Sequence, residues 1–157
     1  MIGVGGSIGF TRPTDRFFDN GLGIAGNVEG YLTPRVSVRG QIGTAWWDII
    51  ALRNPGTIQP VYFLGNLVYN WEGGKWHPYA TGGAGLYHFR FEDPVGVKGS
   101  DNNAGFNVGG GIEYFFTRYA TITGEALYHK VGDVNTGLHL FADGSFWSFM
   151  VGAKRYF

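Results

Sequence analysis

The feature that most constrains this chain is an alternation of apolar with small or polar residues at period two. Successive side chains of a β-strand point to opposite faces of the sheet, so this alternation predicts strands with one apolar face. In the first segment Ile2, Val4 and Ile8 share one face, and glycines with Ser7 share the other. The pattern recurs in eight segments, at residues 2–11, 22–32, 36–46, 61–71, 79–92, 106–114, 121–129 and 147–157.

The linkers between these segments alternate in length. Three are tight, near residues 33–35, 72–76 and 116–119, and four are longer and polar, at 12–20, 51–59, 93–103 and 131–144. Short turns at one end and longer loops at the other are typical of an up-and-down barrel. No segment with a helical period competes, so residues 1–157 are predicted to form a single antiparallel all-β domain.

The polarity of the two faces predicts the environment of this barrel. One face is aliphatic and aromatic, and the other is predicted to hold glycines, polar residues and every mid-strand charge. A soluble barrel has the opposite arrangement. A closed barrel also satisfies all backbone groups within hydrocarbon, and no run of about 20 apolar residues offers a membrane helix instead. We therefore expect an eight-stranded transmembrane β-barrel with short periplasmic turns and longer extracellular loops.

Composition excludes several other classes of protein. The chain has 12 Lys and Arg against 12 Asp and Glu, so no basic excess favours nucleic acid. It has no Cys, which excludes disulfides and thiolate metal sites. Aromatic residues make up 17% and glycines number 28, a combination that fits curved strands better than disorder.

Aromatic residues gather near the predicted strand ends, where a membrane barrel carries interfacial girdles. The predicted girdle consists of Trp46, Tyr69, Trp71, Trp76, Tyr79, Tyr114, Tyr119, Trp147 and Phe157.

Charged and ionisable residues are predicted to form a cluster in the lumen. An eight-stranded barrel is just wide enough for side chains to fill it, so three acids and three bases there are expected to pair as a structural plug. A proton-linked gate or a narrow pore for small solutes or ions is the alternative. The predicted cluster is Glu29, Arg39, His88, Arg90, Glu113, Glu125, His129 and Lys154.

Residues 77–85, 107–114, 121–128 and 151–157 resemble the OmpA/OmpX-type small outer-membrane β-barrels, and the resemblance covers essentially the whole chain. It implies a bacterial outer-membrane location after removal of a leader, a monomer, and an envelope or surface-contact role through the loops. It also implies lipid and lipopolysaccharide as partners, and an assembly signal for the barrel-assembly machinery at Val151, Ala153 and Phe157. Arg155 departs from the pattern, since an aromatic is usual there.

Some small outer-membrane barrels are lipid A-modifying hydrolases, which use a His, a Ser two residues later and an acid. Here His129 is followed by Lys130 and Val131, so that nucleophile is missing. Ser145 or Ser148 could replace it, with Glu125 or Asp143 orienting the base. Nothing in the sequence brings these residues together, so no catalytic residue is assigned.

No cofactor or metal is expected. Residues 21–26 match the dinucleotide pattern G-x-G-x-x-G, but a strand continues where that site requires a helix. The four histidines lie on different segments without metal-ligand spacing. Apolar residues in the long loops, at 17–18, 138 and 140–141, are expected to cover the barrel mouth, enter lipid or contact a partner.

Overall fold

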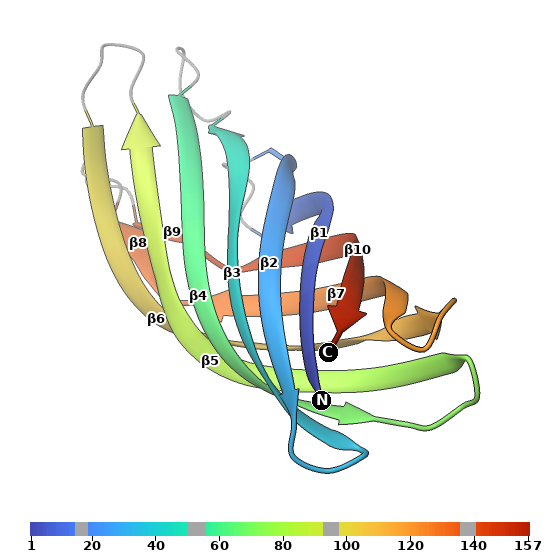
Figure 1. The fold of residues 1–157 in the computed structure, drawn as a ribbon. Coiled ribbons are helices and arrows are strands. Elements are labelled where there is room, and N and C mark those ends of the chain that lie inside the picture. Colours follow the sequence, from blue (N-terminus) through green and yellow to red (C-terminus); the bar gives the residue numbers. More distant parts are fainter. Residues whose placement is uncertain (15–18, 50–55, 93–97, 136–140) are drawn as a thin grey trace.

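The computed structural model describes residues 1–14, 19–49, 56–92, 98–135 and 141–157 and shows a closed β-barrel (Figure 1). None of these residues belongs to a helix long and apolar enough to cross a membrane. The strands are β1 (Ile2–Pro13), β2 (Gly21–Tyr31), β3 (Val36–Ile49), β4 (Gly56–Asn70), β5 (Trp76–Glu92), β6 (Lys98–Phe115), β7 (Ala120–Val131), β8 (Asp133–Asn135), β9 (Phe141–Asp143) and β10 (Phe146–Tyr156).

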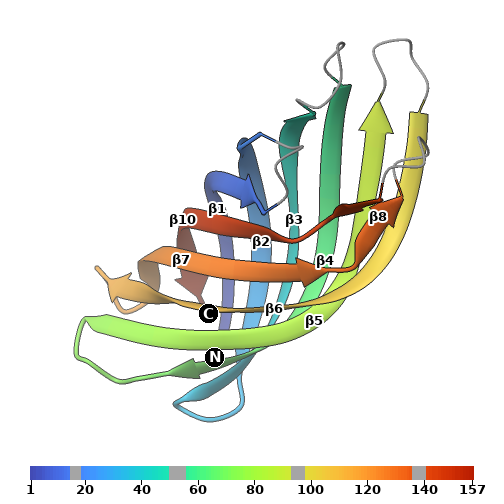
Figure 2. The ribbon, with the colours of Figure 1, turned by 180° about the vertical axis from the view of Figure 1, so that it is seen from behind.

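Eight of the strands form the barrel, in the order β1-β10-β7-β6-β5-β4-β3-β2, and β8 and β9 form a separate two-stranded hairpin. Every pairing in the barrel is antiparallel. Seen from behind, β7 and β10 form the wall opposite β3 and β4 (Figure 2). The predicted eight-stranded antiparallel barrel is confirmed.

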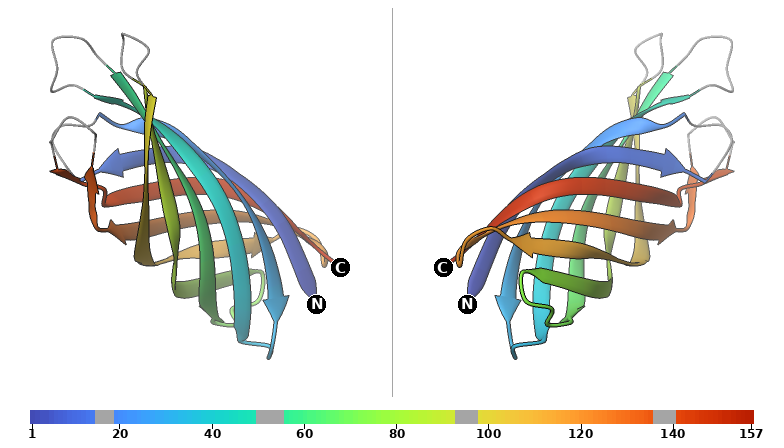
Figure 3. Two further views of the ribbon diagram at one scale, coloured as in Figure 1. Left: turned by 90° about the vertical axis from the view of Figure 1, so that its left-hand side faces the viewer. Right: turned by 90° about the vertical axis from the view of Figure 1, so that its right-hand side faces the viewer.

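The first and last strands close the barrel. Ile2 N donates to Phe157 O at 3.2 Å, and Phe157 N donates to Ile2 O at 2.8 Å. Both termini lie at the end of the barrel that carries the tight turns, which we call the turn end (Figure 3). We call the opposite end the loop end.

The tight turn between β4 and β5 shows how local sequence sets the strand pairing. Trp76 N donates to Gly73 O at 3.3 Å, so Gly74 and Lys75 form a two-residue hairpin turn. Gly74 has a positive φ of 71°, which such turns require and which glycine adopts without strain. This turn places Asn70 opposite Tyr79 and thereby sets which face of β5 lies in the lumen.

Large apolar side chains point outward over most of the barrel wall. Ile8, Val28, Phe63 and Val151 are 54–62% exposed, whereas Glu29 on the inner face is fully buried. A polar interior behind an apolar outer surface fits a barrel surrounded by lipid.

The face predicted for residues 79–92 was wrong. Tyr79, Tyr87, Phe89 and Phe91 are at most 9% exposed and point into the lumen, while His88, Arg90 and Glu92 point outward. For Tyr87, Phe89 and Phe91 the physical reason is the length of β5, which with β4 and β6 extends furthest at the loop end (Figure 1). Outside the hydrocarbon, outward positions accept charge and the lumen accepts aromatic rings. The prediction that one face holds every mid-strand charge is therefore also wrong.

All four long loops were predicted to be longer than they are. β1 continues to Pro13, inside the linker predicted at 12–20. β4 begins at Gly56 and β6 begins at Lys98, inside the linkers predicted at 51–59 and 93–103. The hairpin of β8 and β9 lies within the predicted linker 131–144. Backbone pairing continues beyond the apolar zone, so the end of hydrophobic alternation does not mark the end of a strand.

Candidate functional site

The turn-end half of the lumen contains an ion-pair layer formed by Glu29, Arg39, Glu113, Glu125 and Lys154. Glu29, which is fully buried, is its centre. One oxygen, Oε2, accepts from Arg39 Nε at 3.0 Å and from Lys154 Nζ at 2.6 Å. The other accepts from Ser37 Oγ at 2.5 Å, so both oxygens of this carboxylate are satisfied.

Lys154 and Arg39 extend the layer to the two other carboxylates. Lys154 Nζ lies 3.6 Å from Glu113 Oε2, and Arg39 Nη1 donates to Glu125 Oε2. Tyr79 OH also donates to Glu125, at 2.7 Å. The guanidinium of Arg39 lies 5.0 Å from the centre of the Tyr79 ring, a cation–π distance.

Neutral hydroxyl groups complete the layer. It holds three carboxylates but two cations, because the predicted members His88 and Arg90 point outward. Glu113 Oε1 accepts from Thr121 Oγ1 at 2.5 Å and from Tyr156 OH at 2.6 Å. These hydroxyls were absent from the predicted cluster, although Thr121 and Tyr156 have the inward position in the alternation.

The loop-end half of the lumen contains an aromatic plug formed by Trp47, Tyr62, Tyr87, Phe89, His129 and Phe146. Each of these side chains is at most 1% exposed. Phe146 is the hub: its ring lies 4.3 Å from His129 in a stacked arrangement and 5.0 Å from Trp47 edge-on. It also lies 6.1 Å from Tyr62 and 6.2 Å from Tyr87.

Local packing holds the rings of the plug in place. Trp47 Nε1 donates to Thr11 Oγ1 at 2.6 Å. A Cβ at Gly43 would overlap the Tyr62 ring, so the close approach of this ring to β3 requires glycine. Phe146 was missed from sequence because it lies just before the strand predicted at 147–157.

His129 belongs to the plug and not to the ion-pair layer. Its Nδ1 is 2.9 Å from Tyr87 OH, and its Nε2 is 3.0 Å from Ser148 Oγ. The structure thus joins a histidine and a serine that the sequence could not place together. Both are buried, at 0% and 1% exposure, and Glu125 is bound by Arg39 instead.

The other candidates for a catalytic site do not join this pair. Ser145 Oγ accepts a hydrogen bond from Val131 N at 3.2 Å and donates one to Val131 O at 3.2 Å. The side chain of Asp143 lies outside the described residues. Within the part of the chain that the structure describes, His129 therefore has a hydroxyl on each ring nitrogen and no carboxylate.

Between the two layers lies a polar band. Asn66 on β4 and Asn107 on β6 exchange two hydrogen bonds of 3.0 Å over Gly83 of the strand between them. Asn27 Oδ1, Gln41 Oε1 and Thr81 Oγ1 are buried and have no hydrogen-bond partner among the described residues, and the same holds for Arg39 Nη2 in the ion-pair layer. Such groups need polar neighbours or water, so this band is the least tightly satisfied part of the lumen.

Eight of the nine predicted girdle residues lie on the outer surface. Trp46 and Trp147 are at the loop end, and the rest, Tyr69, Trp71, Trp76, Tyr114, Tyr119 and Phe157, are at the turn end. Tyr79 was wrong, since it is 4% exposed and binds Glu125 inside the lumen. Its position directly after Pro78 gave no indication of which face it occupies.

The predicted assembly residues lie on the outer surface of β10. Val151 is 62% exposed and Phe157 is 70% exposed, and Ala153 lies between them on the same face. Arg155 shares this face, and its guanidinium lies 5.3 Å from the centre of the Phe157 ring. Arg155 lies at the turn end of β10, where the outer surface meets the headgroup region.

Other sequence-based candidates gain no support. No group of three or more His, Cys, Asp or Glu side chains that could hold a metal occurs among the described residues. The apolar loop residues Phe17, Phe18, Leu138 and Leu140 and the side chain of Phe141 lie outside the described part.

Comparison with solved structures finds similar small barrels. NspA, a Neisserial surface protein, matches with a TM-score of 0.78 at 13% identity, over 99% of this chain and 97% of that chain. Ail, the attachment invasion locus protein of Yersinia pestis, matches with 0.64 at 14%, over 98% and 97%. The outer membrane enzyme PagL matches with 0.52 at 16%, over 99% of both chains. At these identities the likeness shows the fold alone.

Comparison with curated protein sequences finds no match. A family model described as the outer membrane protein beta-barrel domain matches residues 2–154. This match spans nearly the whole barrel, including all eight of its strands, and agrees with the apolar outer surface and the polar interior. The chain therefore belongs to the outer membrane protein beta-barrel domain family and is a barrel of the bacterial outer membrane.

Proposed function

We propose that this barrel is a closed, non-enzymatic membrane protein that serves an envelope or surface-contact role through its loop end. One observation carries the proposal: the lumen is filled at two successive levels, by the aromatic plug and by the ion-pair layer. The hub Phe146 and the centre Glu29 are both fully buried. A pore of useful conductance would require both levels to open.

The surface around the barrel supports the partners that we propose. Outer-membrane lipid and lipopolysaccharide contact the apolar wall, and the barrel-assembly machinery meets the Val151, Ala153 and Phe157 edge during insertion. The barrel acts as a monomer. A surface-contact role fits the extended β4, β5 and β6, and the solved Ail structure in complex with the heparin analogue sucrose octasulfate is a similar barrel with a bound ligand.

Planar-bilayer recordings test the closed state. The refolded protein is expected to give no stable ion-sized openings, because the two layers block the lumen independently. A protein that folds in detergent and shows heat-modifiable migration on SDS gels is the starting material. Reproducible openings from such protein, absent from mock reconstitutions, would contradict the proposal.

The second candidate is a narrow pore for ions or small solutes. It is favoured by the polar band, where Asn27, Gln41 and Thr81 carry buried polar atoms without a partner among the described residues. The same recordings separate the two functions, since a pore through this band would conduct in the unmodified protein.

The third candidate is a lipid A-modifying hydrolase, favoured by the hydrogen bond between His129 and Ser148. We expect no hydrolysis, because both residues are buried and the described part of the chain shows no carboxylate on His129. Incubation of the refolded protein with lipopolysaccharide is expected to release no fatty acid by mass spectrometry. Release that Ser148→Ala abolishes, in a variant that still folds, would establish the enzyme instead.

A further inference from the structure

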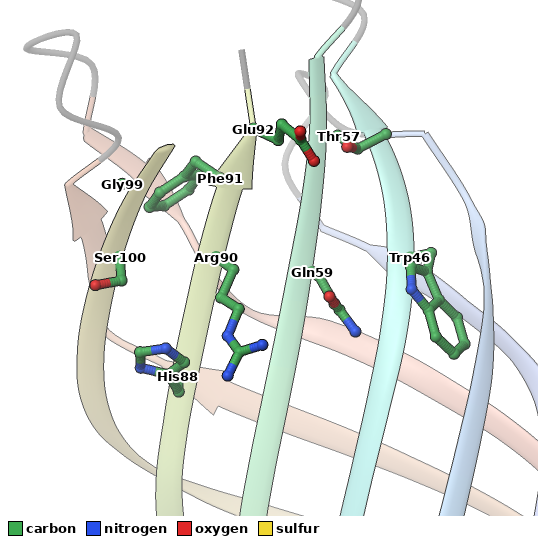
Figure 4. A pocket seen from close by; sticks show the side chains of 9 residues that line it. All are labelled: Trp46, Thr57, Gln59, His88, Arg90, Phe91, Glu92, Gly99 and Ser100. Atoms are coloured by element: carbon green, nitrogen blue, oxygen red, sulfur yellow. The ribbon is translucent and has the colours of Figure 1, made fainter. Parts of the chain in front are cut away.

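A polar hollow of about 650 Å³ lies on the outer surface of the barrel at the loop end (Figure 4). We call it the outer groove. The side chains that matter for its chemistry come from β3, β4, β5 and β6 and are Trp46, Gln59, His88, Arg90, Glu92 and Ser100. One further lining residue, Phe91, points into the lumen. The outer groove lies in the region where the predicted face of β5 was wrong.

The outer groove begins where the apolar belt ends. On three neighbouring strands the outward side chain changes from apolar to polar. The change falls between Leu86 and His88 on β5, between Val61 and Gln59 on β4, and between Ala104 and Asn102 on β6. It falls at paired positions on β5 and β6 and one row later on β4, where Val61 pairs with His88. A change shared by three strands marks the boundary of the hydrocarbon, so the groove faces the headgroup region of the outer leaflet.

Arg90 is the cation of this groove. It is opposite Gln59 on β4 and Ser100 on β6, in the second row beyond the apolar belt. Figure 4 shows its guanidinium between the side chains of Gln59 and His88. Among the residues that the structure describes, none forms an ion pair or hydrogen bond with this guanidinium. Its five donors are therefore open to a ligand.

The neighbours of Arg90 are held in position by other contacts. His88 Nδ1 is 2.5 Å from Asn102 Oδ1, which fixes the imidazole ring and leaves Nε2 for a ligand. Gln59 Nε2 donates to Thr44 Oγ1 at 3.2 Å, so this amide is also oriented. Together with the hydroxyl of Ser100, these groups surround one cation with neutral hydrogen-bonding partners.

We propose that the outer groove binds the phosphorylated sugar headgroup of a lipopolysaccharide molecule in the outer leaflet. The Arg90 guanidinium binds a phosphate in the fork geometry that suits it, and Gln59, His88 and Ser100 bind sugar hydroxyls. The exposed indole of Trp46 lies at the apolar boundary of the groove, where it packs on the sugar ring or the start of an acyl chain.

The position of Glu92 agrees with this orientation of the headgroup. Glu92 lies one row further from the hydrocarbon than Arg90, opposite Thr57. A phosphate at the membrane surface meets Arg90 first, and the carboxylate of Glu92 lies beyond it. A ligand that carried its negative charge further out, such as a polyanion approaching from solution, would be repelled by Glu92.

Native mass spectrometry of the refolded full chain in dodecyl maltoside, titrated with diphosphoryl lipid A, tests this site, which rests on the proposed membrane orientation. Arg90→Gln is expected to weaken binding about tenfold, because one charge-assisted, bidentate contact is lost. Monophosphoryl lipid A and phosphatidylglycerol are expected to bind more weakly than diphosphoryl lipid A. Heat-modifiable migration confirms that each variant is folded.

Two matched variants make the test specific. Arg12→Gln removes another exposed, outward arginine at the loop end, on β1, and is expected to leave affinity unchanged. Glu92→Gln is expected to leave affinity unchanged or raise it. A lipid A affinity of Arg90→Gln within twofold of that of the unmodified protein overturns the site. An equal loss of affinity in Arg12→Gln also overturns it. Displacement of lipid A by millimolar inorganic phosphate overturns it too, because the groove would then bind a free anion rather than the headgroup.

This test and the test of the proposed function fail separately. Openings in planar bilayers with an Arg90-dependent affinity for lipid A would refute the closed lumen and leave the groove in place. A barrel that shows no openings in planar bilayers, and whose lipid A affinity is unchanged by Arg90→Gln, would refute the groove and leave the closed lumen in place.

Discussion

Arg39→Ala is expected to lower the free energy of unfolding of the barrel by about 3–5 kcal/mol, the cost of breaking a buried ion pair. Arg39 is 2% exposed and joins Glu29 to Glu125. Without it, three carboxylates share the single cation of Lys154, and Glu125 keeps the Tyr79 hydroxyl as a donor. Glu113→Ala is expected to cost less, since Lys154 then still pairs with Glu29.

Urea unfolding of the protein refolded in lipid vesicles, followed by tryptophan fluorescence, measures this loss. Arg35→Ala is the matched control, because Arg35 is exposed in a turn and its removal is expected to change stability by no more than about 0.5 kcal/mol. Arg39→Ala is also expected to stay closed in planar bilayers, because the aromatic plug is untouched. A stability loss equal to that of Arg35→Ala would show that the ion-pair layer does not hold the barrel together.

Phe146→Ala is expected to lower the free energy of unfolding by about 3–5 kcal/mol, through lost contacts and the cavity left behind. The ring is fully buried and contacts four other rings of the plug. Neighbouring rings are anchored on separate strands, so the cavity collapses only in part. This variant opens the loop-end level and leaves the ion-pair layer closed.

The same urea unfolding assay measures this effect, with Phe116→Ala as control. Phe116 is 54% exposed in a turn, so the same truncation there is expected to cost far less. Phe146→Ala alone is expected to remain silent in planar bilayers, whereas Phe146→Ala combined with Arg39→Ala is expected to conduct if it folds. Openings from Phe146→Ala alone would show that the ion-pair layer is not a barrier.

Alternation in the sequence predicts strands, and in this chain it predicts their number and order, but it does not say which face is inside. The assignment relied on polarity, which works within the hydrocarbon and fails beyond it. On β5 the aromatic face of Tyr87 and Phe89 lies inside and the charged face of Arg90 lies outside. Strand pairing contains the missing information, because residues directly opposite each other share a face.

The tight turn at Gly74 contains the information needed to say which face of β5 lies inside the barrel. A two-residue turn there places Tyr79 opposite Asn70, an inward residue, and so assigns the whole of β5. The hydrogen-bond partners of Glu113 were harder to predict, because Thr121 reaches it from the neighbouring strand β7 and Tyr156 reaches it from β10, two strands away. The hub position of Phe146 depends on how four strands converge, which no single segment of sequence records.

The closure of β1 on β10 has a consequence for how this chain acquires its structure. The hydrogen bonds between Ile2 and Phe157 join the first strand of the barrel to its last, so the barrel cannot close before both β1 and β10 are present. Loops that long cost much entropy to close, and proteins dominated by such distant pairings fold slowly. Until that moment both terminal strands expose unpaired backbone groups, which hydrocarbon does not tolerate. Insertion into the membrane and the meeting of the two ends are therefore expected to be a single concerted event.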